Sequence, residues 1–451
     1  MNVFFDLDGV LVDYVELHTS SFLEAWNKLN TSHPIDVCFH AIHLEARSTR
    51  QKLAILKEYF YEFDIKESEV SELKQRITQE KLKSARVYKK TCEAIAYLQR
   101  QGVKISVCSN SVRPTVMTSL EKITPIGTFE LILSNESVLN PKPNPEIYLL
   151  ALKSLNVKPE DVLVFEDSEV GKAAARAAGL RVIEVVDALD LSPRFLELAL
   201  SGDLPCCAPV YNVVIPMAGL GSRFSAAGYK TPKPFLPIDG EPMYLKVIQN
   251  VVPAELMNRA VIHIIVREEH KHLFEMAEKP RNIKIHCVPA LTEGAACTVL
   301  SIKSEINNEY PIVIANSDQY LEWSVDNFYR CLTHPDYDGV ISTFYQPDPS
   351  DLRWSYANID DEGTVTRVAE KQYIGDLATT GIYGWKRGAD FVSDAEAMIR
   401  ENIRVNKEFY VCPVYNSGIA VGRQFRTLNC KKMWGLGVPA DYEHFLKHFK
   451  P

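Results

Sequence analysis

Residues 1–10 read MNVFFDLDGV, and this pattern decides the fold of the first half of the chain. The apolar residues 3–5 predict a buried strand, which ends in two carboxylates, Asp6 and Asp8, and a glycine turn. Because alternate side chains of a strand point to the same side, this spacing sets both carboxylates together. Like charges held that close repel unless a cation or a proton separates them. The pattern therefore indicates a Mg²⁺-assisted site, although a polar strand exit before a turn would read the same way.

A second buried-type strand and a proline-rich loop carry further polar residues. The segment VKISVCSNS (103–111) ends in Ser109 and Asn110. The segment LNPKPNPEIY (139–148) places Lys142 between two prolines, which excludes a helix interior. Taken singly, Ser109 could be a strand-end cap and Lys142 a solvated loop charge.

A third apolar strand completes the set. The segment VLVFEDSEVG (162–171) reaches Glu166 and Asp167 and continues into an alanine-rich helix. Strands that alternate with helices predict a parallel sheet, and open α/β sheets bind their ligands beyond the carboxyl ends of the strands. We expect Glu166 and Asp167 to meet Asp6 at that edge.

Over roughly its first 190 residues, this order of motifs resembles the haloacid dehalogenase superfamily of phosphotransferases. The resemblance implies that Asp6 is the nucleophile that forms an aspartyl-phosphate and that Asp8 is the general acid/base. It further implies roles for the remaining polar residues, with Ser109, Asn110 and Lys142 holding the phosphoryl group and Asp6, Asp8, Glu166 and Asp167 binding Mg²⁺. A carboxylate attacks a phosphate only when the phosphate charge is neutralised, which this set would do.

Between residues 14 and 87 lies a polar, helix-patterned segment that the resemblance identifies as a small cap over the active site. VELHTSSFLEAWNKL (15–29) and STRQKLAILKEYF (48–60) predict amphipathic helices. His18 and Arg50 are the candidates for substrate contact, unless His18 packs at a hinge and Arg50 is a solvated charge. The segment looks like the β-phosphoglucomutase branch, so phosphatase and mutase both stay open.

The whole chain is too long for one such domain. Its 451 residues suggest two or three α/β units. A net charge of −8 argues against a nucleic-acid partner, and no apolar run approaches the roughly 18 residues of a membrane span. Ten cysteines without CxxC pairs, behind an N-terminus with no room for a signal peptide, predict a cytoplasmic protein. Residues 201–211 (SGDLPCCAPVY) predict a short linker between a first domain at 1–200 and a second at 212–451.

The pattern restarts beyond the linker. NVVIPMAGLGSRF (212–224) predicts a strand that enters a glycine-rich loop with Gly219, Gly221, Ser222 and Arg223. Such a loop lets backbone N–H groups approach phosphates, and arginine adds an anion clamp, although a tight turn alone would explain the glycines. The loop lacks the GK[ST] of a Walker motif.

The motifs that follow the glycine-rich loop also indicate phosphate binding. KTPKPFLPIDGEPM (230–243) places Lys233 between prolines, TEGAACTVL (292–300) contains Gly294, and PIVIANSD (311–318) is an apolar strand that ends at Asp318. VAEKQ (368–372) follows with Glu370 and Lys371.

From about residue 212 to the end, the order of these elements resembles the sugar-phosphate nucleotidyltransferases. The resemblance implies that the glycine loop, Lys233 and Gly294 bind the nucleoside triphosphate, that Asp318 binds Mg²⁺, and that Glu370 and Lys371 contact the acceptor. Many members carry a second metal-binding aspartate where MWGLGVPADY (433–442) has Gly435. Asp441 lies further along and is not expected to reach the metal, so we expect one carboxylate or an unidentified second ligand.

Together the motifs predict two Rossmann-like α/β domains, the first with a helical cap. They predict a bifunctional enzyme that uses Mg²⁺ in both domains. One domain would remove phosphate from a sugar phosphate, and the other would join a nucleoside triphosphate, CTP or UTP first, to a sugar or polyol phosphate for capsule or lipopolysaccharide synthesis. Alternatives are a mutase or an inactive scaffold as the first domain and a glycosyltransferase as the second. Lys233 disfavours the glycosyltransferase. The oligomeric state is not predicted.

Overall fold

The computed structural model describes residues 1–44, 49–60, 63, 65–204, 210–219, 222–275 and 282–449. At residues 38, 41, 42, 222 and 275 it describes the backbone only. The chain divides into two compact units, residues 1–204 and 205–451. The division falls inside the expected 201–211 linker, of which residues 205–209 lie outside the described residues. Among the described helices, none combines the length and the apolar composition that a membrane span needs.

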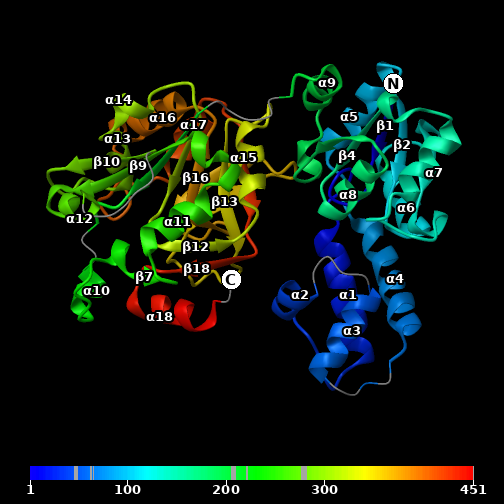
Figure 1. Cartoon of the computed structure of the whole chain (residues 1–451), viewed down its shortest axis with the longest axis horizontal. Helices are drawn as coiled ribbons and strands as arrows, with labels where there is room; N and C mark the ends of the chain where they lie inside the picture. Colours follow the sequence, from blue (N-terminus) through cyan, green and yellow to red (C-terminus); the bar gives the residue numbers. More distant parts are fainter. Residues whose placement is uncertain are drawn as a thin grey trace. The chain divides into compact units, whose positions relative to one another are not determined.

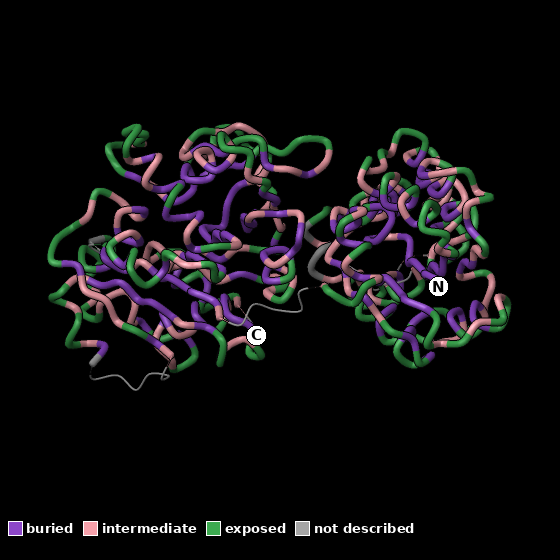
Figure 2. Tube along the Cα trace, turned by 90° about the horizontal axis from the view of Figure 1, so that it is seen from above, coloured by how far each residue is buried: buried purple, intermediate pink, exposed green. Residues whose placement is uncertain are grey.

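The first unit is built on a parallel sheet of five strands in the order β3-β2-β1-β4-β5 (Figure 1). The strands are β1 (Asn2–Phe5), β2 (Lys104–Cys108), β3 (Phe129–Leu133), β4 (Val162–Glu166) and β5 (Arg181–Glu184). Most of their apolar residues are buried at the centre of the unit, and buried stretches near the N-terminus are purple in Figure 2. The strand order brings β1 between β2 and β4, so the ends of all three motif strands are neighbours.

Helices flank this sheet, and a separate group of helices forms the inserted segment. The flanking helices are α5 (Lys89–Arg100), α6 (Arg113–Ile123), α7 (Glu146–Leu155), α8 (Glu169–Ala177) and α9 (Pro193–Ser201). The inserted helices are α1 (Val15–Leu29), α2 (Val37–His43), α3 (Thr49–Phe60) and α4 (Glu67–Ser84). The two amphipathic helices predicted from the sequence are α1 and α3. The inserted segment has its own apolar cluster around Trp26, separate from the core of the sheet.

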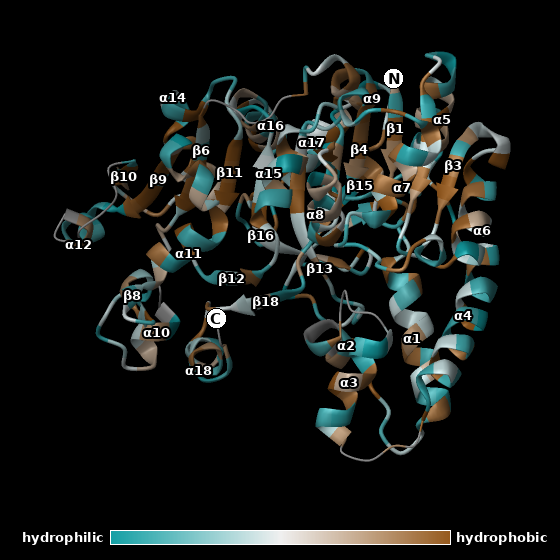
Figure 3. Cartoon of the chain, turned by 45° about the vertical axis from the view of Figure 1, so that its right-hand side comes forward, coloured by the Kyte–Doolittle hydropathy of each residue, from teal (hydrophilic) through white to brown (hydrophobic). Residues whose placement is uncertain are grey.

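The second unit is built on a nine-stranded mixed sheet, whose main path runs β10-β9-β6-β11-β16-β13-β17. Its strands are β6 (Tyr211–Pro216), β9 (Ala260–Arg267), β10 (Ile283–Val288), β11 (Ile312–Ala315), β13 (Gly339–Tyr345), β14 (Ser355–Ile359), β15 (Val365–Glu370), β16 (Leu377–Trp385) and β17 (Phe425–Asn429). Strands β10, β9, β6 and β11 are parallel and β16 is antiparallel to β11. Both units are thus α/β, as predicted, with hydrophobic strands inside each (Figure 3).

Smaller elements surround the second sheet. Two short ribbons pair β7 (Pro237–Ile238) with β8 (Glu241–Pro242), and β12 (Gln319–Glu322) with β18 (Lys432–Gly435). The helices are α10 (Ser222–Ala226), α11 (Met243–Val251), α12 (Lys271–Glu275), α13 (Ala295–Leu300), α14 (Lys303–Ile306), α15 (Val325–Thr333), α16 (Gly388–Arg400), α17 (Val414–Ala420) and α18 (Pro439–His448).

The buried His263 on β9, which lies against the half-buried His286 on β10, makes the stability of the second unit pH-dependent. Nδ1 of His263 lies 3.0 Å from Nε2 of His286, and burial lowers the pKa of His263 from 6.5 to about 4. The folded state therefore holds a neutral imidazole. The second unit therefore has its full stability above pH 6.5. As the pH falls toward 4, this stability is lost, because the unfolded state takes up a proton that the folded state does not. From pH 7 to pH 4.5 we expect a loss of about 2 kcal/mol.

Urea unfolding followed by tryptophan fluorescence measures this loss, because four of the five tryptophans lie in the second unit. His263→Gln cannot take up the proton and should lose about 2 kcal/mol less over the same pH range. Equal pH dependence in both proteins would contradict the prediction.

Candidate functional sites

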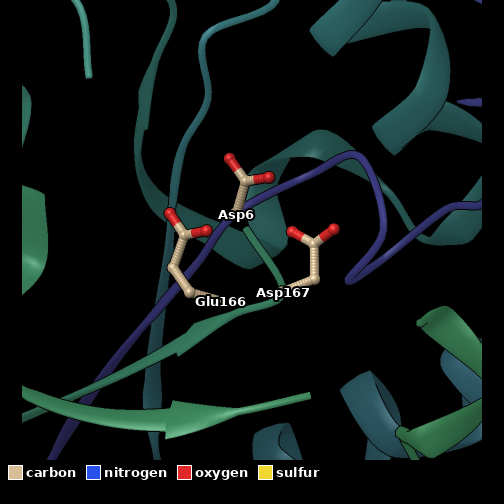
Figure 4. A group of neighbouring side chains, drawn as sticks. All are labelled: Asp6, Glu166 and Asp167. Atoms are coloured by element: carbon tan, nitrogen blue, oxygen red, sulfur yellow. The ribbon is translucent and has the colours of Figure 1, made fainter. Parts of the chain in front are cut away.

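Three carboxylates converge at the carboxyl end of the first sheet. Asp6 follows β1, Glu166 ends β4 and Asp167 comes next, and oxygens of all three lie within 4.8 Å of one another. Figure 4 shows the three side chains directed toward a common point. The glycine of the first motif makes this possible: Gly9 has φ +80°, and a Cβ there would lie 2.2 Å from Oδ2 of Asp167.

Lys142 lies against this group. Its Nζ is 2.7 Å from Oδ1 of Asp6 and 2.5 Å from Oε1 of Glu166, which also accepts a hydrogen bond of 2.6 Å from the Tyr148 hydroxyl. The Asn110 amide bonds to both the N–H and the C=O of Lys142, so Asn110 positions the lysine loop. The sequence predicted phosphate contact for Asn110, whereas its side chain is used in this positioning contact.

Burial, together with neighbouring negative charge, raises the pKa values of two of the carboxyls. Burial raises the pKa of Asp6 well above its ordinary value, and the charges of Glu166 and Asp167 add to the effect while Lys142 opposes it. Burial and the charge of Glu166 raise the pKa of Asp167 to about 7. Three carboxylates face one ammonium in a buried site, and this excess negative charge is what a divalent cation neutralises.

The carboxylate of Asp8 is directed elsewhere. Its Oδ1 lies 3.1 Å from Nε2 of His18, and its Oδ2 accepts a 2.6 Å hydrogen bond from Ser111. Burial raises the pKa of Asp8, but the contacts with His18 and Ser111 outweigh burial, so its pKa is lowered. Asp8 was predicted as a metal ligand, but its side chain stands outside the three-carboxylate group.

Ser109 is buried behind this region. Its Oγ accepts a 3.0 Å hydrogen bond from the N–H of Ser111, which orders the turn after β2. Ser109 was predicted to contact phosphate, and it lies in the same turn as Ser111.

A cleft of about 650 Å³ opens between the inserted helices and the turn after β2. Of the two residues predicted to contact substrate, His18 lines this cleft, whereas Arg50 is exposed on α3 and is not among the lining residues. Lys52 and Lys74 line the cleft instead. Lys52 Nζ lies 2.7 Å from Nε2 of His40. Burial lowers the pKa of Lys74, and the nearby charge of Asp8 opposes this shift.

In the second unit, the central pair is Lys233 and Asp318. Nζ of Lys233 is 2.6 Å from Oδ2 of Asp318, although 85 residues separate them in sequence. Asp318 follows β11, whose parallel neighbour β6 leads into the glycine-rich loop. The pair lines a cavity of about 610 Å³ together with Gly219 and Arg223. Gly221 lies outside the described residues, and Ser222 begins α10 with its side chain undescribed.

The backbone around position 294 requires a glycine. Gly294 has φ +133°, and a Cβ at this position would lie 2.4 Å from the carbonyl oxygen of Phe409. A side chain is therefore excluded by the backbone of the neighbouring segment, independently of any base that the loop would contact.

The predicted acceptor residues line a second cavity of about 680 Å³, which shares Arg223 and Asp318 with the first. Glu370 accepts a hydrogen bond from Ser355, and burial raises its pKa. Nζ of Lys371 donates a 2.7 Å bond to the Tyr410 hydroxyl, which raises the pKa of Lys371.

Several residues of these sites were not predicted. They are Tyr148, Ser111, Lys52 and Lys74 in the first unit and Arg353, Ser355, Tyr410 and Asp441 in the second. Ser111 is the third residue of the SNS turn. Its position two residues after Ser109 could have identified it as a site residue. Ser355 begins β14, and the others lie on helices or loops whose orientation depends on packing.

The donor set of the first unit fits a divalent cation. Oδ1 of Asp167 is buried without a hydrogen-bond partner among the described residues, and oxygen donors are the ligands that Mg²⁺ prefers. In the second unit, Asp318 offers a carboxylate beside a cavity large enough for a nucleotide.

Comparison with known proteins agrees with this division. Residues 3–185 match the family described as haloacid dehalogenase-like hydrolase, and residues 212–410 match the nucleotidyl transferase family. A phosphorylated carbohydrates phosphatase of Thermotoga maritima is 33% identical over 204 residues, covering 43% of this chain and 89% of that protein. Protein CbbY of Rhodobacter capsulatus is 28% identical over 186 residues, covering 40% of this chain and 82% of that protein.

A solved structure resembles the second unit. The nucleoside-diphosphate-sugar pyrophosphorylase of Vibrio cholerae is 27% identical and aligns over 52% of this chain and all of that one, with a TM-score of 0.44.

The chain belongs, through its first unit, to the haloacid dehalogenase-like hydrolases. It joins this phosphatase-type domain to a nucleotidyl transferase domain and is an enzyme of both classes.

Proposed function

We propose that the protein is a bifunctional enzyme of activated sugar or polyol synthesis. Its first unit releases phosphate from a phosphorylated sugar or polyol, and its second unit couples a nucleoside triphosphate to a sugar or polyol phosphate with loss of pyrophosphate. The observation that carries the proposal is a lysine–carboxylate pair at the strand ends of each unit, Lys142 with Asp6 and Lys233 with Asp318. Such pairs place cationic charge where phosphates react.

In the first unit, Asp6 would attack the phosphorus and form an aspartyl-phosphate, while Asp8 would protonate the leaving oxygen and later activate water. Mg²⁺ bound by Asp6, Glu166 and Asp167 would neutralise phosphate charge. Lys142 holds Asp6 in place and adds positive charge. His18 would orient Asp8 through their 3.1 Å contact. The Thermotoga relative, a phosphatase of phosphorylated carbohydrates, supports this substrate class.

In the second unit, an oxygen of the acceptor phosphate would attack the α-phosphorus of the nucleotide. Arg223 and the glycine-rich loop would hold the triphosphate, and Lys233 would stabilise the charge that develops at the reacting phosphorus. Asp318 would hold Mg²⁺, which would supply positive charge to the phosphates when bound. Glu370 and Lys371 would contact the acceptor, since both line the cavity that shares Asp318. CTP or UTP is the proposed donor, within a cytoplasmic pathway to capsule or lipopolysaccharide.

The test is a matrix of the four nucleoside triphosphates against sugar and polyol phosphates, with pyrophosphate as one readout and inorganic phosphate as the other. We expect one acceptor family to give pyrophosphate and a related phosphate ester to give inorganic phosphate. Transfer of phosphate between positions of one sugar, without release, would identify the first unit as a mutase. No turnover in any combination would contradict the proposal.

We also expect the two activities to separate at the linker. Each unit has its own sheet and its own buried core, so proteins that end near Pro205 or begin near Pro209 should each fold. Circular dichroism checks folding, and the two readouts of the matrix check activity. Each half should keep one activity and lose it in EDTA. A folded second half without nucleotide product would mean that the catalytic sites depend on each other.

A further inference from the structure

We propose that Tyr410 is a positioning residue for nucleotidyl transfer, which holds the Lys371 ammonium at the border between the two cavities of the second unit. At this border the ammonium meets the phosphate of the acceptor. The inference rests on the proposed function of this unit, because it concerns how an acceptor phosphate reaches the nucleotide. Tyr410 belongs to none of the sequence motifs, and its role is inferred from its contacts.

Tyr410 lies where the cavities of about 610 Å³ and 680 Å³ meet. The described residues that line both cavities are Arg223, Asn316, Asp318 and Tyr410. Arg223 belongs to α10, and Asn316 and Asp318 follow β11. Tyr410 comes from the segment before α17, so a distant part of the chain supplies this side of the border. A side chain at this place can act on a group that lies between nucleotide and acceptor.

The backbone next to Tyr410 is fastened to the loop that contains Gly294. The N–H of Phe409 donates a 2.8 Å hydrogen bond to the carbonyl of Glu293, and the carbonyl of Phe409 accepts a 3.0 Å hydrogen bond from the N–H of Ala296. The side chain of Phe409 is buried. These contacts fix the residue before Tyr410 on both of its backbone polar groups, so the position of Tyr410 is set by the nucleotide side of the unit.

Tyr410 contacts Lys371 in two ways. Nζ of Lys371 donates a 2.7 Å hydrogen bond to the Tyr410 hydroxyl and lies 4.7 Å from the centre of the Tyr410 ring. The backbone of Lys371 is also held: its φ is +55°, and its N–H donates a 3.0 Å hydrogen bond to the carbonyl of Trp354. Because a left-handed backbone is unfavourable for a residue other than glycine, it persists only where surrounding contacts impose it. Both ends of the Lys371 side chain are therefore fixed.

The chemistry needs a lysine that is held in this way. An ammonium at the end of a flexible four-carbon stem has no fixed position of its own. In-line attack requires the acceptor oxygen to stand about 3–3.5 Å from the phosphorus. The ammonium neutralises the acceptor phosphate, so its position sets where that oxygen stands. A Tyr410–Lys371 contact that served only the fold would lower stability without separating acceptor from nucleotide, and kinetics distinguish the two roles.

The experiment measures pyrophosphate release by the full chain, with the nucleoside triphosphate and the sugar or polyol phosphate that react in the matrix. Tyr410→Phe keeps the ring and removes the hydroxyl. It should raise the KM for the acceptor phosphate and lower kcat, each at least about fivefold, and leave the KM for the triphosphate within about twofold. Tyr345→Phe is the matched control, because Tyr345 is 66% exposed and is not among the described residues that line either cavity. It should change none of these constants.

A double-mutant cycle tests whether Tyr410 acts through Lys371. Lys371→Ala should lower kcat/KM for the acceptor at least about twentyfold, and adding Tyr410→Phe should lower it further by less than about twofold, because the two residues act as one unit. Effects that multiply, an unaffected Lys371→Ala, an equal rise of both KM values in Tyr410→Phe or unchanged kinetics of that variant would each overturn the inference and leave the proposed function standing. No pyrophosphate from the unaltered chain with any pair of substrates would overturn both.

Discussion

Asp6→Asn should abolish phosphate release while pyrophosphate release stays unchanged. Asparagine is nearly isosteric but cannot form an acyl phosphate, so we expect a loss of at least about a thousandfold, or roughly 4 kcal/mol of transition-state stabilisation. The substitution removes one partner of Lys142, but the lysine keeps its 2.5 Å contact with Glu166, so the fold should persist.

The measurement is inorganic phosphate release from the best substrate of the matrix, with circular dichroism as the folding check. Asp161→Asn is the matched control, because Asp161 is an exposed aspartate of the same unit, before β4. It should keep full phosphatase activity. Substantial phosphate release by Asp6→Asn would show that the nucleophile lies elsewhere.

Asp318→Ala and Lys233→Ala should each reduce nucleotidyl transfer by at least about a hundredfold. Removal of a metal carboxylate, or of the cation at a phosphoryl-type transition state, commonly costs on the order of 3 kcal/mol or more. The side chains of the pair are 16% and 29% exposed, so circular dichroism is needed to check that each variant still folds.

Pyrophosphate release measures the effect, and phosphate release by the first unit serves as the internal control. Lys447→Ala, which removes an exposed lysine of α18, should leave both activities unchanged. A mild effect of both site substitutions would place the nucleotidyltransferase centre away from the Lys233–Asp318 pair.

The residues that the sequence placed well stand at the ends of buried strands. Asp6, Glu166, Asp167 and Asp318 each stand at the end of an apolar run. The parallel sheet of the first unit brings the first three together at one edge, and Asp318 follows β11 in the mixed sheet of the second. A strand motif predicts such positions because the strand direction and the two-residue repeat leave little freedom. Two other predicted residues are placed differently. The Asn110 side chain, predicted to contact phosphate, holds the Lys142 loop, and Arg50, predicted to contact substrate, does not line the cleft.

Residues on helices and loops were harder to place, because a helix can present any face to a cleft until it is packed. Tyr148 on α7 and Lys74 on α4 reach the first site through the packing of those helices. Asp441 is the sharpest example. It lies six residues after Gly435, and the turn between β18 and α18 sets its Oδ2 3.4 Å from the position that a Cβ of Gly435 would take.

The sequence by itself determined the two α/β units, their order and the strand-end residues of both sites, because buried strands and glycine turns are local patterns. Only the tertiary structure decided the contacts made between segments. These include Lys142 with Asp6, separated by 136 residues, and Lys233 with Asp318, separated by 85. The physical reason is that such contacts depend on strand order and helix packing, which are settled by burial across the whole domain and not by any local run of residues.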